Sequence, residues 1–352
     1  MSPRYLFPLF LAFGLTLPKY NTHAQDLNYT HYTVESGLLL PSNEVYGILF
    51  DKNDVLWATT DRGVWRYDGY TPKQFTVADG LKENTNFRIF SDTLGRIWVT
   101  SINNYLYQID GDSVRIHPMS ESIHKVGNSS GFIQQISKNA DGSIYLSFNR
   151  PGLIRFKTGE KPEKIDEQRI NHDDASVAIH YKPEEYYWDM IRIPDTNQHL
   201  KTTVTTQNDW IYLTCGLMDK KNNYRKDLCP IGKNEFLFSC SNKVFHIKDG
   251  KLKGERAFHN DITKVYSDNK GDVWIGFESE GVLRFLNGDL KSDPHRYLSG
   301  ETVSGIAQDH ENNYWFTTTT NGIFQANTLD ITVFNNMTTD IKDNMITAMV
   351  SD

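Results

Sequence analysis

The chain has 352 residues, of which 38% are hydrophobic and 12% aromatic, and its formal net charge is −7. This charge, with no block rich in Lys and Arg, argues against nucleic acid or an anionic membrane surface as the main partner. The three cysteines, Cys215, Cys229 and Cys240, show no CxxC spacing, which indicates neither a zinc site nor a dense disulfide framework. We predict buried thiols, with a disulfide between Cys229 and Cys240 across a short hairpin as the alternative.

Residues 1–24 are typical of a secretory signal peptide. Arg4 supplies an early positive charge, an apolar run extends from Tyr5 to Leu17, and small residues precede a cleavage position after Ala24. The 13 residues of that run would extend only about 20 Å as a helix, short of the roughly 30 Å hydrocarbon core of a membrane. We therefore predict a cleaved signal and an exported, soluble remainder rather than a membrane anchor.

A motif with a central Trp recurs along the chain. Full copies begin at Asp51, Asp92, Asp268 and Asp309, and the spacing within each pair of neighbours is 41 residues. Each copy places its Trp six residues after the first Asp, and a weaker copy from Asn139 has Tyr145 there. The residue three after that Asp or Asn is Asp, Gly or Asn, the types that tolerate positive φ in a tight hairpin turn. This period, built of short strands, predicts the blades of a β-propeller.

We therefore predict an all-β fold, a β-propeller of about seven four-stranded blades over residues 25–352. Residues 29–35 resemble an outer strand without a blade in front of it, and are predicted to close the ring on the last blade. The predicted blades occupy about residues 43–81, 82–124, 125–165, 166–225, 226–257, 258–298 and 299–337, the fourth being degenerate. Residues 338–352 either begin a further repeat or help to close the ring. A sequence that stops inside a repeat favours a truncated fragment of a larger protein.

The repeat resembles a known family. The resemblance rests on Asp92, Gly95, Trp98, Gly63, Tyr67, Asp68 and Gly69, with the ADGL sequence at Ala78 to Leu81. Together they resemble the two-component regulator propeller repeat, strongly in four blades and poorly across residues 166–240. The resemblance implies the periplasmic, ligand-sensing propeller of a Gram-negative sensor histidine kinase. In such a protein a small β-sandwich, one transmembrane helix and a cytoplasmic kinase follow the propeller.

The repeated Trp and Asp side chains are interpreted as structural. Each Trp lies mid-strand between apolar neighbours, so packing between blades is favoured over a sugar-stacking platform. Each Asp is one blade away from the next, so a turn-forming hydrogen bond is favoured over metal ligation. His172, Asp173 and Asp174 form the only local cluster of metal-ligand types, and a solvated charge run explains them. We predict no metal and no cofactor.

Three classes of function stay open. The first is a binding module that senses a small molecule or oligosaccharide and signals to a downstream kinase module. The second is a secreted propeller enzyme acting on polysaccharide, a lyase or glycosidase with carboxylates from different blades, and the third is a protein-binding scaffold. The resemblance favours the first. The chain has no phosphoacceptor segment or ATP-lid pattern, so it is predicted not to be an enzyme itself. A homodimer is compatible with each class.

The expected recognition face is formed by the loops that join the second strand to the third and the outer strand to the next inner strand. These loops differ from blade to blade while the opposite turns follow the repeat, as a surface available for recognition would. Arg62 and Arg150 are expected to contact anionic or hydroxyl groups. The predicted ligand-binding residues are Asp61, Arg62, Asn84, Asn103, Asn104, Asn149, Arg150, Glu278, Glu280 and Asn321. No catalytic residue is predicted, and the alternative place for a site is the insertion at residues 166–225.

Overall fold

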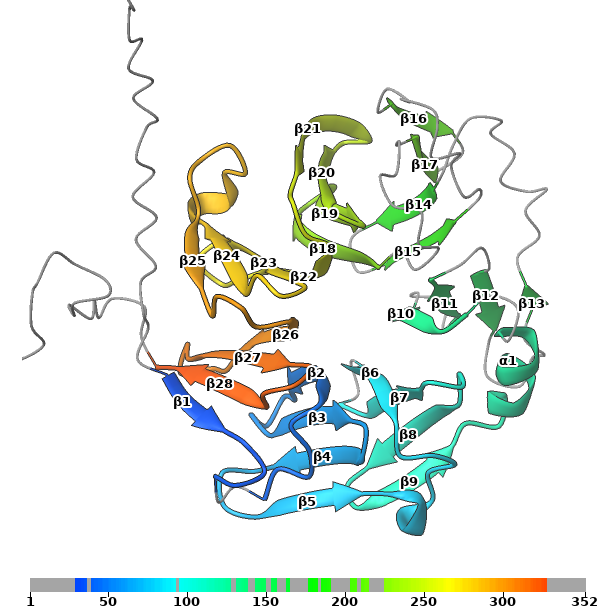
Figure 1. The fold of residues 1–352 in the computed structure, drawn as a ribbon. Coiled ribbons are helices and arrows are strands. Elements are labelled where there is room, and N and C mark those ends of the chain that lie inside the picture. Colours follow the sequence, from blue (N-terminus) through cyan, green and yellow to red (C-terminus); the bar gives the residue numbers. More distant parts are fainter. Residues whose placement is uncertain are drawn as a thin grey trace, which may run out of the picture.

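The computed structural model describes residues 29–36, 39–92, 95–127, 131–138, 143–149, 153–156, 163–164, 177–182, 185–190, 203–207, 210–214 and 225–327. These residues form seven four-stranded sheets, which are arranged as blades around a common centre (Figure 1). The predicted all-β propeller of about seven blades is therefore confirmed. The predicted signal peptide and residues 338–352 lie outside the described residues.

Five blades are built from four consecutive strands, each blade running outward in chain order. Blade 1 contains β2 (Val45–Phe50), β3 (Leu56–Thr60), β4 (Gly63–Tyr67) and β5 (Pro72–Phe75). Blade 2 contains β6 (Asn86–Ser91), β7 (Ile97–Ser101), β8 (Leu106–Asp110) and β9 (Ser113–Ile116). Blade 3 contains β10 (Ile133–Lys138), β11 (Ile144–Phe148), β12 (Leu153–Phe156) and β13 (Glu163–Lys164). Blade 5 contains β18 (Lys226–Gly232), β19 (Glu235–Cys240), β20 (Lys243–Lys248) and β21 (Lys251–Ala257). Blade 6 contains β22 (Ile262–Ser267), β23 (Val273–Phe277), β24 (Val282–Phe285) and β25 (His295–Tyr297).

Short helices lie between some of these strands. They are η1 (Val77–Asp79), α1 (Ser120–Gly127) and η3 (Leu286–Gly288). None of the helices in the described part of the chain has the length and apolar character that a membrane crossing requires.

Blade 4 departs from the simple order. It contains β14 (Val177–Lys182), β15 (Glu185–Met190), β16 (Thr203–Gln207) and β17 (Trp210–Thr214), hydrogen-bonded in the order β15, β14, β17, β16. Strand β15 contacts β10 and β11 of blade 3, and β16 contacts the outer strand β21 of blade 5. The second strand of this blade in the sequence is therefore its innermost strand.

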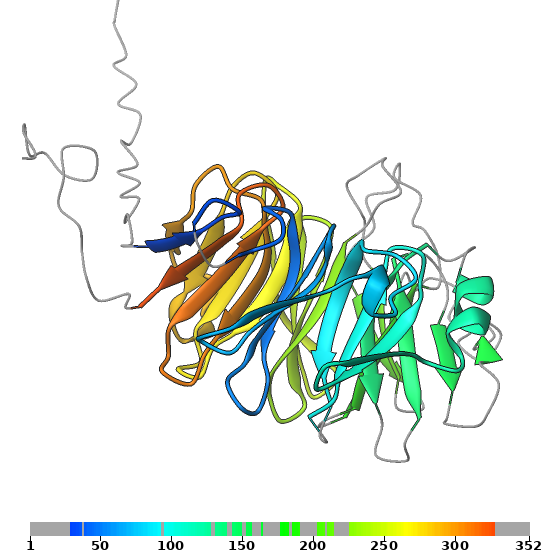
Figure 2. The same cartoon turned by 90° about the horizontal axis from the view of Figure 1, so that it is seen from below.

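Blade 7 joins the two ends of the described chain. It contains β26 (Val303–Gln308), β27 (Tyr314–Thr318) and β28 (Ile323–Ala326), with β1 (Tyr29–Tyr32) as the outer strand. Strand β1 pairs antiparallel with β28 from Tyr29 opposite Ala326 to Tyr32 opposite Ile323, and the two strands lie side by side in both views (Figures 1 and 2). The predicted ring-closing strand is confirmed.

The repeated Asp binds both the hairpin turn and the Trp of its blade. One carboxylate oxygen accepts backbone N–H groups of the turn, as Asp268 Oδ1 does from Lys270 at 3.0 Å and Asp272 at 2.9 Å. The other accepts the indole Nε1–H six residues on: 3.0 Å from Trp57 to Asp51, 3.0 Å from Trp98 to Asp92, 2.9 Å from Trp274 to Asp268 and 2.8 Å from Trp315 to Asp309. The turn-forming role is confirmed, and the indole bond is an additional finding.

The turn residues behave as the repeat predicts. Positive φ angles occur at Asp54 (60°), Gly95 (78°), Gly271 (84°) and Asn312 (68°), each three residues after the repeated Asp. These angles are compatible with Gly, Asn and Asp, whereas β-branched residues would be strained there.

The repeated Trp rings are buried and pack against the next blade. Trp57 packs with Val99 of blade 2, Trp98 with Leu146 of blade 3, Trp274 with Phe316 of blade 7 and Trp315 with Ala58 of blade 1. The predicted packing between blades is confirmed, so these rings are not available to a ligand.

Two of the cysteines are buried thiols. Cys229 on β18 lies opposite Leu237 on β19, whereas Cys240 lies opposite Lys226. The two residues are thus offset along the hairpin, and the alternative of a disulfide between them is wrong. Cys215 lies outside the described residues.

Candidate functional site

A β-bulge occurs at the second residue of the inner strand in five blades. The register of the pairing shifts there in β2, β6, β10, β22 and β26. A bulge leaves one residue out of the ladder and turns its side chain in a new direction. The five bulged residues, Tyr46, Phe87, Gln134, Thr263 and Ser304, all line the central cavity or its mouth.

Two of the bulged hydroxyl groups also connect neighbouring blades. Thr263 Oγ1 donates to the Val303 carbonyl, and Ser304 Oγ donates to the Val45 carbonyl. The side chains of Tyr46, Phe87 and Gln134 are larger and reach the cavity surface. The bulges therefore join the blades and also direct side chains to the channel.

Equivalent residues near the start of six inner strands form one layer of the channel wall: the third residue of β2, β6, β10, β22 and β26, and the second residue of β18. Their partners on the second strands show that they are equivalent: Gly47 pairs with Thr59, Arg88 with Thr100, Gln135 with Ser147, Asp227 with Ser239, Lys264 with Gly276 and Gly305 with Thr317. All six line a cavity of about 180 Å³. We call them the channel layer.

Glycine is required at two positions of the channel layer because a threonine of the same blade and an atom of the next blade are both close. A Cβ atom on Gly47 would lie 2.9 Å from Thr59 Oγ1 and 3.2 Å from the Phe87 carbonyl oxygen. A Cβ atom on Gly305 would lie 2.6 Å from Thr317 Oγ1 and 3.1 Å from Ile48 Cγ2. The four other positions carry long polar or charged side chains, which supply the chemistry of the channel.

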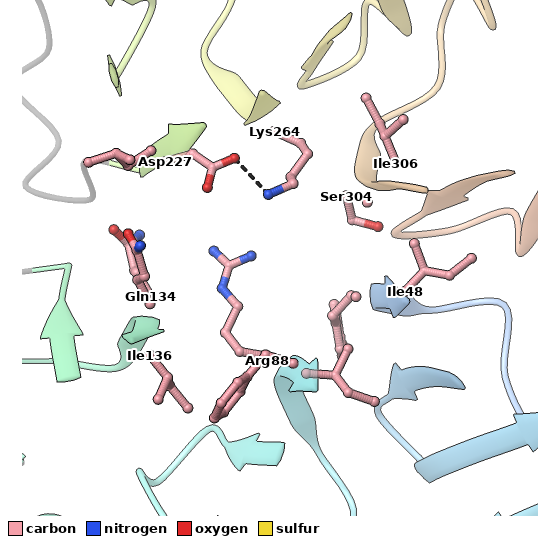
Figure 3. A pocket seen from close by; sticks show the side chains of 15 residues that line it. Ile48, Arg88, Gln134, Ile136, Asp227, Lys264, Ser304 and Ile306 are labelled. Atoms are coloured by element: carbon pink, nitrogen blue, oxygen red, sulfur yellow. Dashed lines mark hydrogen bonds and ion pairs between the residues drawn. The ribbon is translucent and has the colours of Figure 1, made fainter. Parts of the chain in front are cut away.

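Asp227 and Lys264 form an ion pair within this layer. Asp227 Oδ2 accepts Lys264 Nζ at 2.8 Å and the Val265 backbone N–H at 2.9 Å. Figure 3 shows this pair above Arg88, whose guanidinium group points into the cavity. The pair uses one positive and one negative charge, so Arg88 supplies an excess positive charge in the channel layer.

Arg88 and Gln134 carry polar atoms that lack a protein partner. The Nε atom of Arg88 and the Nε2 atom of Gln134 are buried, and neither has a hydrogen-bond acceptor among the described residues. Burial lowers the pKa of Arg88, the Asp227 carboxylate opposes this effect, and Arg225 adds to it. Buried donors of this kind are costly unless an acceptor is supplied.

A second cavity, of about 160 Å³, forms the mouth of the channel. It shares Tyr46, Arg88 and Ser304 with the first cavity, so the two cavities adjoin. The other lining residues are Phe87, Phe132, Arg225, Thr263 and Thr319. Because the inner strands begin here, the mouth opens on the face formed by the loops expected to bind a ligand.

An aromatic row lines one side of the mouth. The Tyr46 and Phe87 rings meet edge to face with centroids 4.9 Å apart, and Phe87 meets Phe132 in the same way at 5.5 Å. The Tyr46 hydroxyl donates to Glu44 Oε2 at 2.7 Å. Burial, and then the hydrogen bond to Glu44, raise the pKa of Tyr46, so this residue stays neutral.

Several predicted site residues hold the loops of blades 1 to 3 in place. Asn84 Oδ1 accepts the Val77 N–H at 3.0 Å, and Asn103 Nδ2 donates to Glu83 at 2.6 Å. Two further amides fix the start of β10: Asn104 Oδ1 accepts the Ile133 N–H and Asn149 Oδ1 accepts the Phe132 N–H, both at 2.9 Å. The last two residues therefore position the Phe132 ring at the mouth, while their own side chains are buried.

The other predicted residues are dispersed over the same face. Glu280 pairs with Arg296, and Asn321 donates to Glu301 at 2.9 Å. Glu278 lines a separate open hollow between blades 5 and 6 with His259 and Asp261. Arg62 is exposed. The negative charge of Asp61 contributes to the raised pKa of Tyr46, which lies nearby. Arg150 lies outside the described residues. The structure does not gather this set into one site, and ligand contact by its members stays a prediction.

The residues that sequence reasoning missed lie at the beginnings of the inner strands. A signal was present, because the copies read VYG, NFR, ITK and VSG at these points. Their third residue changes between Gly, Arg and Lys while the Asp and Trp positions stay the same. A position that varies in charge inside a uniform repeat indicates a surface facing the channel.

Residues 39–62 match the family model described as Two component regulator propeller. The chain carries the two-component regulator propeller repeat. The match extends from the loop before β2 to the turn after β3, so it includes the inner strand that brings Tyr46 and Gly47 to the channel. Among curated proteins, none matches the chain.

Solved structures share the fold of this repeat protein. It is similar to the extracellular domains of two proteins from B. thetaiotaomicron named as hybrid two component systems. The first has 15% identity and a TM-score of 0.59, with 86% of this chain and 42% of that chain covered. The second has 16% identity and a TM-score of 0.60, with 85% and 40% covered. Virginiamycin B lyase from Staphylococcus aureus has 12% identity and a TM-score of 0.58, with 85% and 98% covered. The chain thus spans less than half the length of the first two structures.

Proposed function

We propose that this chain is the ligand-sensing propeller of a two-component sensor, exported to the periplasm and joined in the full protein to a kinase module. The observation that carries the proposal is the family match at residues 39–62, within which β2 forms part of the channel wall. The similarity to extracellular domains of hybrid two component systems supports it.

The channel supports binding better than catalysis. Its described lining contains one carboxylate, Asp227, which is already bonded to Lys264 and to the Val265 backbone. A glycosidase needs two carboxyl groups on either side of the bond to be cleaved. The unbonded donors of Arg88 and Gln134 can instead hold a ligand without changing it.

Ligand binding is tested on the purified chain. We expect thermal unfolding in the presence of mono- and oligosaccharides and small organic acids to show at least one compound that raises the melting temperature. Mass spectrometry of the same mixtures should show that the compound is unchanged. Turnover of the bound compound would replace the sensor proposal with an enzymatic one.

Export is tested separately. Expression with residues 1–24 in a Gram-negative host should place the protein in the periplasmic fraction with a new N-terminus after Ala24. Intact protein that still begins at Met1 in that fraction would contradict the predicted cleavage.

A further inference from the structure

Two guanidinium groups lie near each other at the mouth of the channel. Arg88 comes from blade 2 and Arg225 from the start of blade 5, and both line the 160 Å³ cavity. The positive charge of Arg225 contributes to the lowered pKa of Arg88, as a nearby like charge does. Among the described residues, no carboxylate forms an ion pair with either group. Like charges held in this way are destabilising unless an anion lies between them.

Two of the negative groups near the mouth are already bonded, whereas the Oδ1 atom of Asp61, whose charge acts on Tyr46, is buried without a hydrogen-bond partner in the described part of the chain. Asp227 bonds Lys264 and the Val265 N–H, and Glu44 accepts the Tyr46 hydroxyl. Arg88 and Arg225 carry two positive charges against the single charge of Asp61, so a positive excess remains at the mouth of a protein whose total formal charge is −7. Guanidinium groups bind carboxylates through paired, charge-assisted hydrogen bonds.

The aromatic row indicates the chemistry of the part of a ligand that does not contact the arginines. Phe87 and Phe132 line the cavity that contains both arginines, and Thr263 and Ser304 add hydroxyl oxygen atoms to the same wall. A volume of about 160 Å³ is below the roughly 300 Å³ at which drug-sized sites begin. One ring with apolar faces and polar edges fits the enclosed part of this cavity.

We propose that the channel mouth binds a small carboxylate with a ring-shaped body, held by Arg88 and Arg225 through its carboxylate and by Phe87 and Phe132 through its ring. This inference rests on the proposed sensor function and specifies the ligand class. The bound carboxylate links blade 2 with blade 5 across the channel. Binding thus replaces the repulsion between the two arginines by an attraction of both to the ligand, and so couples blades that are not neighbours.

The test is isothermal titration calorimetry on the purified chain with ring carboxylates and their neutral counterparts. The pairs are glucuronate with glucose, galacturonate with galactose, and benzoate with benzyl alcohol, and sulfate serves as an anion without a ring. The variants are Arg88→Gln, Arg225→Gln and Phe87→Ala. Arg115→Gln is the matched control, because Arg115 is exposed on the outer strand of the same blade as Arg88. Arg62→Gln tests the loop face.

We expect at least one carboxylate to bind, its neutral counterpart to bind at least about tenfold more weakly, and each arginine variant to lose about 10- to 100-fold in affinity. Arg115→Gln should bind like the unchanged protein. Without ligand, Arg88→Gln should not lower the melting temperature, because it removes a like charge; a purely structural role would lower it.

Three outcomes would overturn the inference. If a neutral sugar binds and no carboxylate does, the ligand class is wrong while the sensor function stands. If Arg62→Gln abolishes carboxylate binding and Arg88→Gln does not, the site lies in the loops. If sulfate binds as tightly as the best carboxylate and Phe87→Ala has no effect, the ring has no role.

Discussion

The two ends of each inner hairpin follow different rules. At the end that carries the repeated Asp, four blades use the same carboxylate to hold the turn and the indole of the same Trp. At the other end, the channel layer contains Gly, Arg, Gln, Asp, Lys and Gly in equivalent register positions. The first end specifies the blade, and the second end is chemically different in almost every blade.

This difference has a simple physical origin. The indole is covered by the next blade, and its N–H needs an acceptor, so both residues of the Asp and Trp pair are constrained. A channel-layer side chain faces a cavity, where shape and charge are limited only by the neighbouring blade. The propeller can therefore change its binding chemistry at the channel without changing the unit that makes a blade.

The largest effect is expected at the Trp end. Trp274→Ala removes a ring that is 0% exposed and should lower the free energy of unfolding by about 3–5 kcal/mol. Urea denaturation followed by circular dichroism measures this change. Trp274→Phe, which keeps a ring but removes the N–H, should lose less. A loss below about 1 kcal/mol for the Ala variant would mean that the rings do not hold the blades together.

The second effect concerns pH. Burial raises the pKa of Asp92, but hydrogen bonds from Arg96 and Trp98 together outweigh this and hold it below the ordinary value of 3.8. A carboxyl group with a lowered folded-state pKa stabilises the protein above pH 3.8, and this contribution is lost as the pH falls through the folded-state pKa.

Asp92→Asn should therefore destabilise the protein by about 1–3 kcal/mol at pH 7, and the difference from the unchanged protein should shrink below pH 3.8. Urea midpoints measured from pH 7 to pH 3 give this difference. Asp110→Asn, at the exposed end of β8, is the control and should differ little at any pH. A constant difference for Asp92→Asn over the whole range would show that its charge does not contribute.

The third effect is expected to be small. Lys264 and Asp227 form an ion pair whose side chains are 29% and 21% exposed. Lys264→Gln should change the free energy of unfolding by less than about 1 kcal/mol, as partly solvated pairs do. Differential scanning calorimetry measures the change. A loss as large as that of Trp274→Ala would show that the channel layer is also structural, and the contrast between the two ends would fail.

The smallest effect is chemical rather than thermodynamic. Cys229 lies two residues after Asp227 on β18 but is buried in the blade, and burial raises the pKa of its thiol to about 12. Iodoacetamide should therefore leave Cys229 unmodified in the folded protein at pH ~8 and alkylate it in urea, because the thiolate is the reactive form. Peptide mass spectrometry identifies the modified residue. Rapid alkylation of Cys229 without denaturant would place it at the channel surface instead.

The fold could be predicted where its determinants are local. The Asp, turn residue and Trp of each full repeat lie within seven residues of one another, so spacing alone specifies the turn and the buried strand. Ring closure by residues 29–32 was predictable because this segment resembles an outer strand. The order of blade 4 was not, because the repeat is degenerate over residues 166–225 and the missing Asp and Trp pair alone does not indicate another order: blade 5 also lacks this pair and keeps the simple one.

The channel could not be predicted in the same way. Which residue faces it depends on a bulge at the second position of the inner strand, and a bulge is a property of pairing between two strands. Asn104 and Asn149 are a second case in which the sequence does not show the partner of a side chain. Their polar side chains were predicted to meet a ligand, but they bond backbone N–H groups at the start of β10. Sequence alone does not show which partner an amide will take.

The pairing of β1 with β28 also sets an order of events in time. His31 contacts Asn321, 290 residues further along the chain, and at about 5–20 residues per second synthesis of that interval takes roughly 15–60 s. The strand made first is thus among the last to find its partner, and its edge stays unpaired until β28 has been made. Such a protein is vulnerable as a nascent chain and protected once the ring is complete. During this interval residues 29–32 must be kept from pairing with other strand edges, which is a requirement of closing the ring in this way.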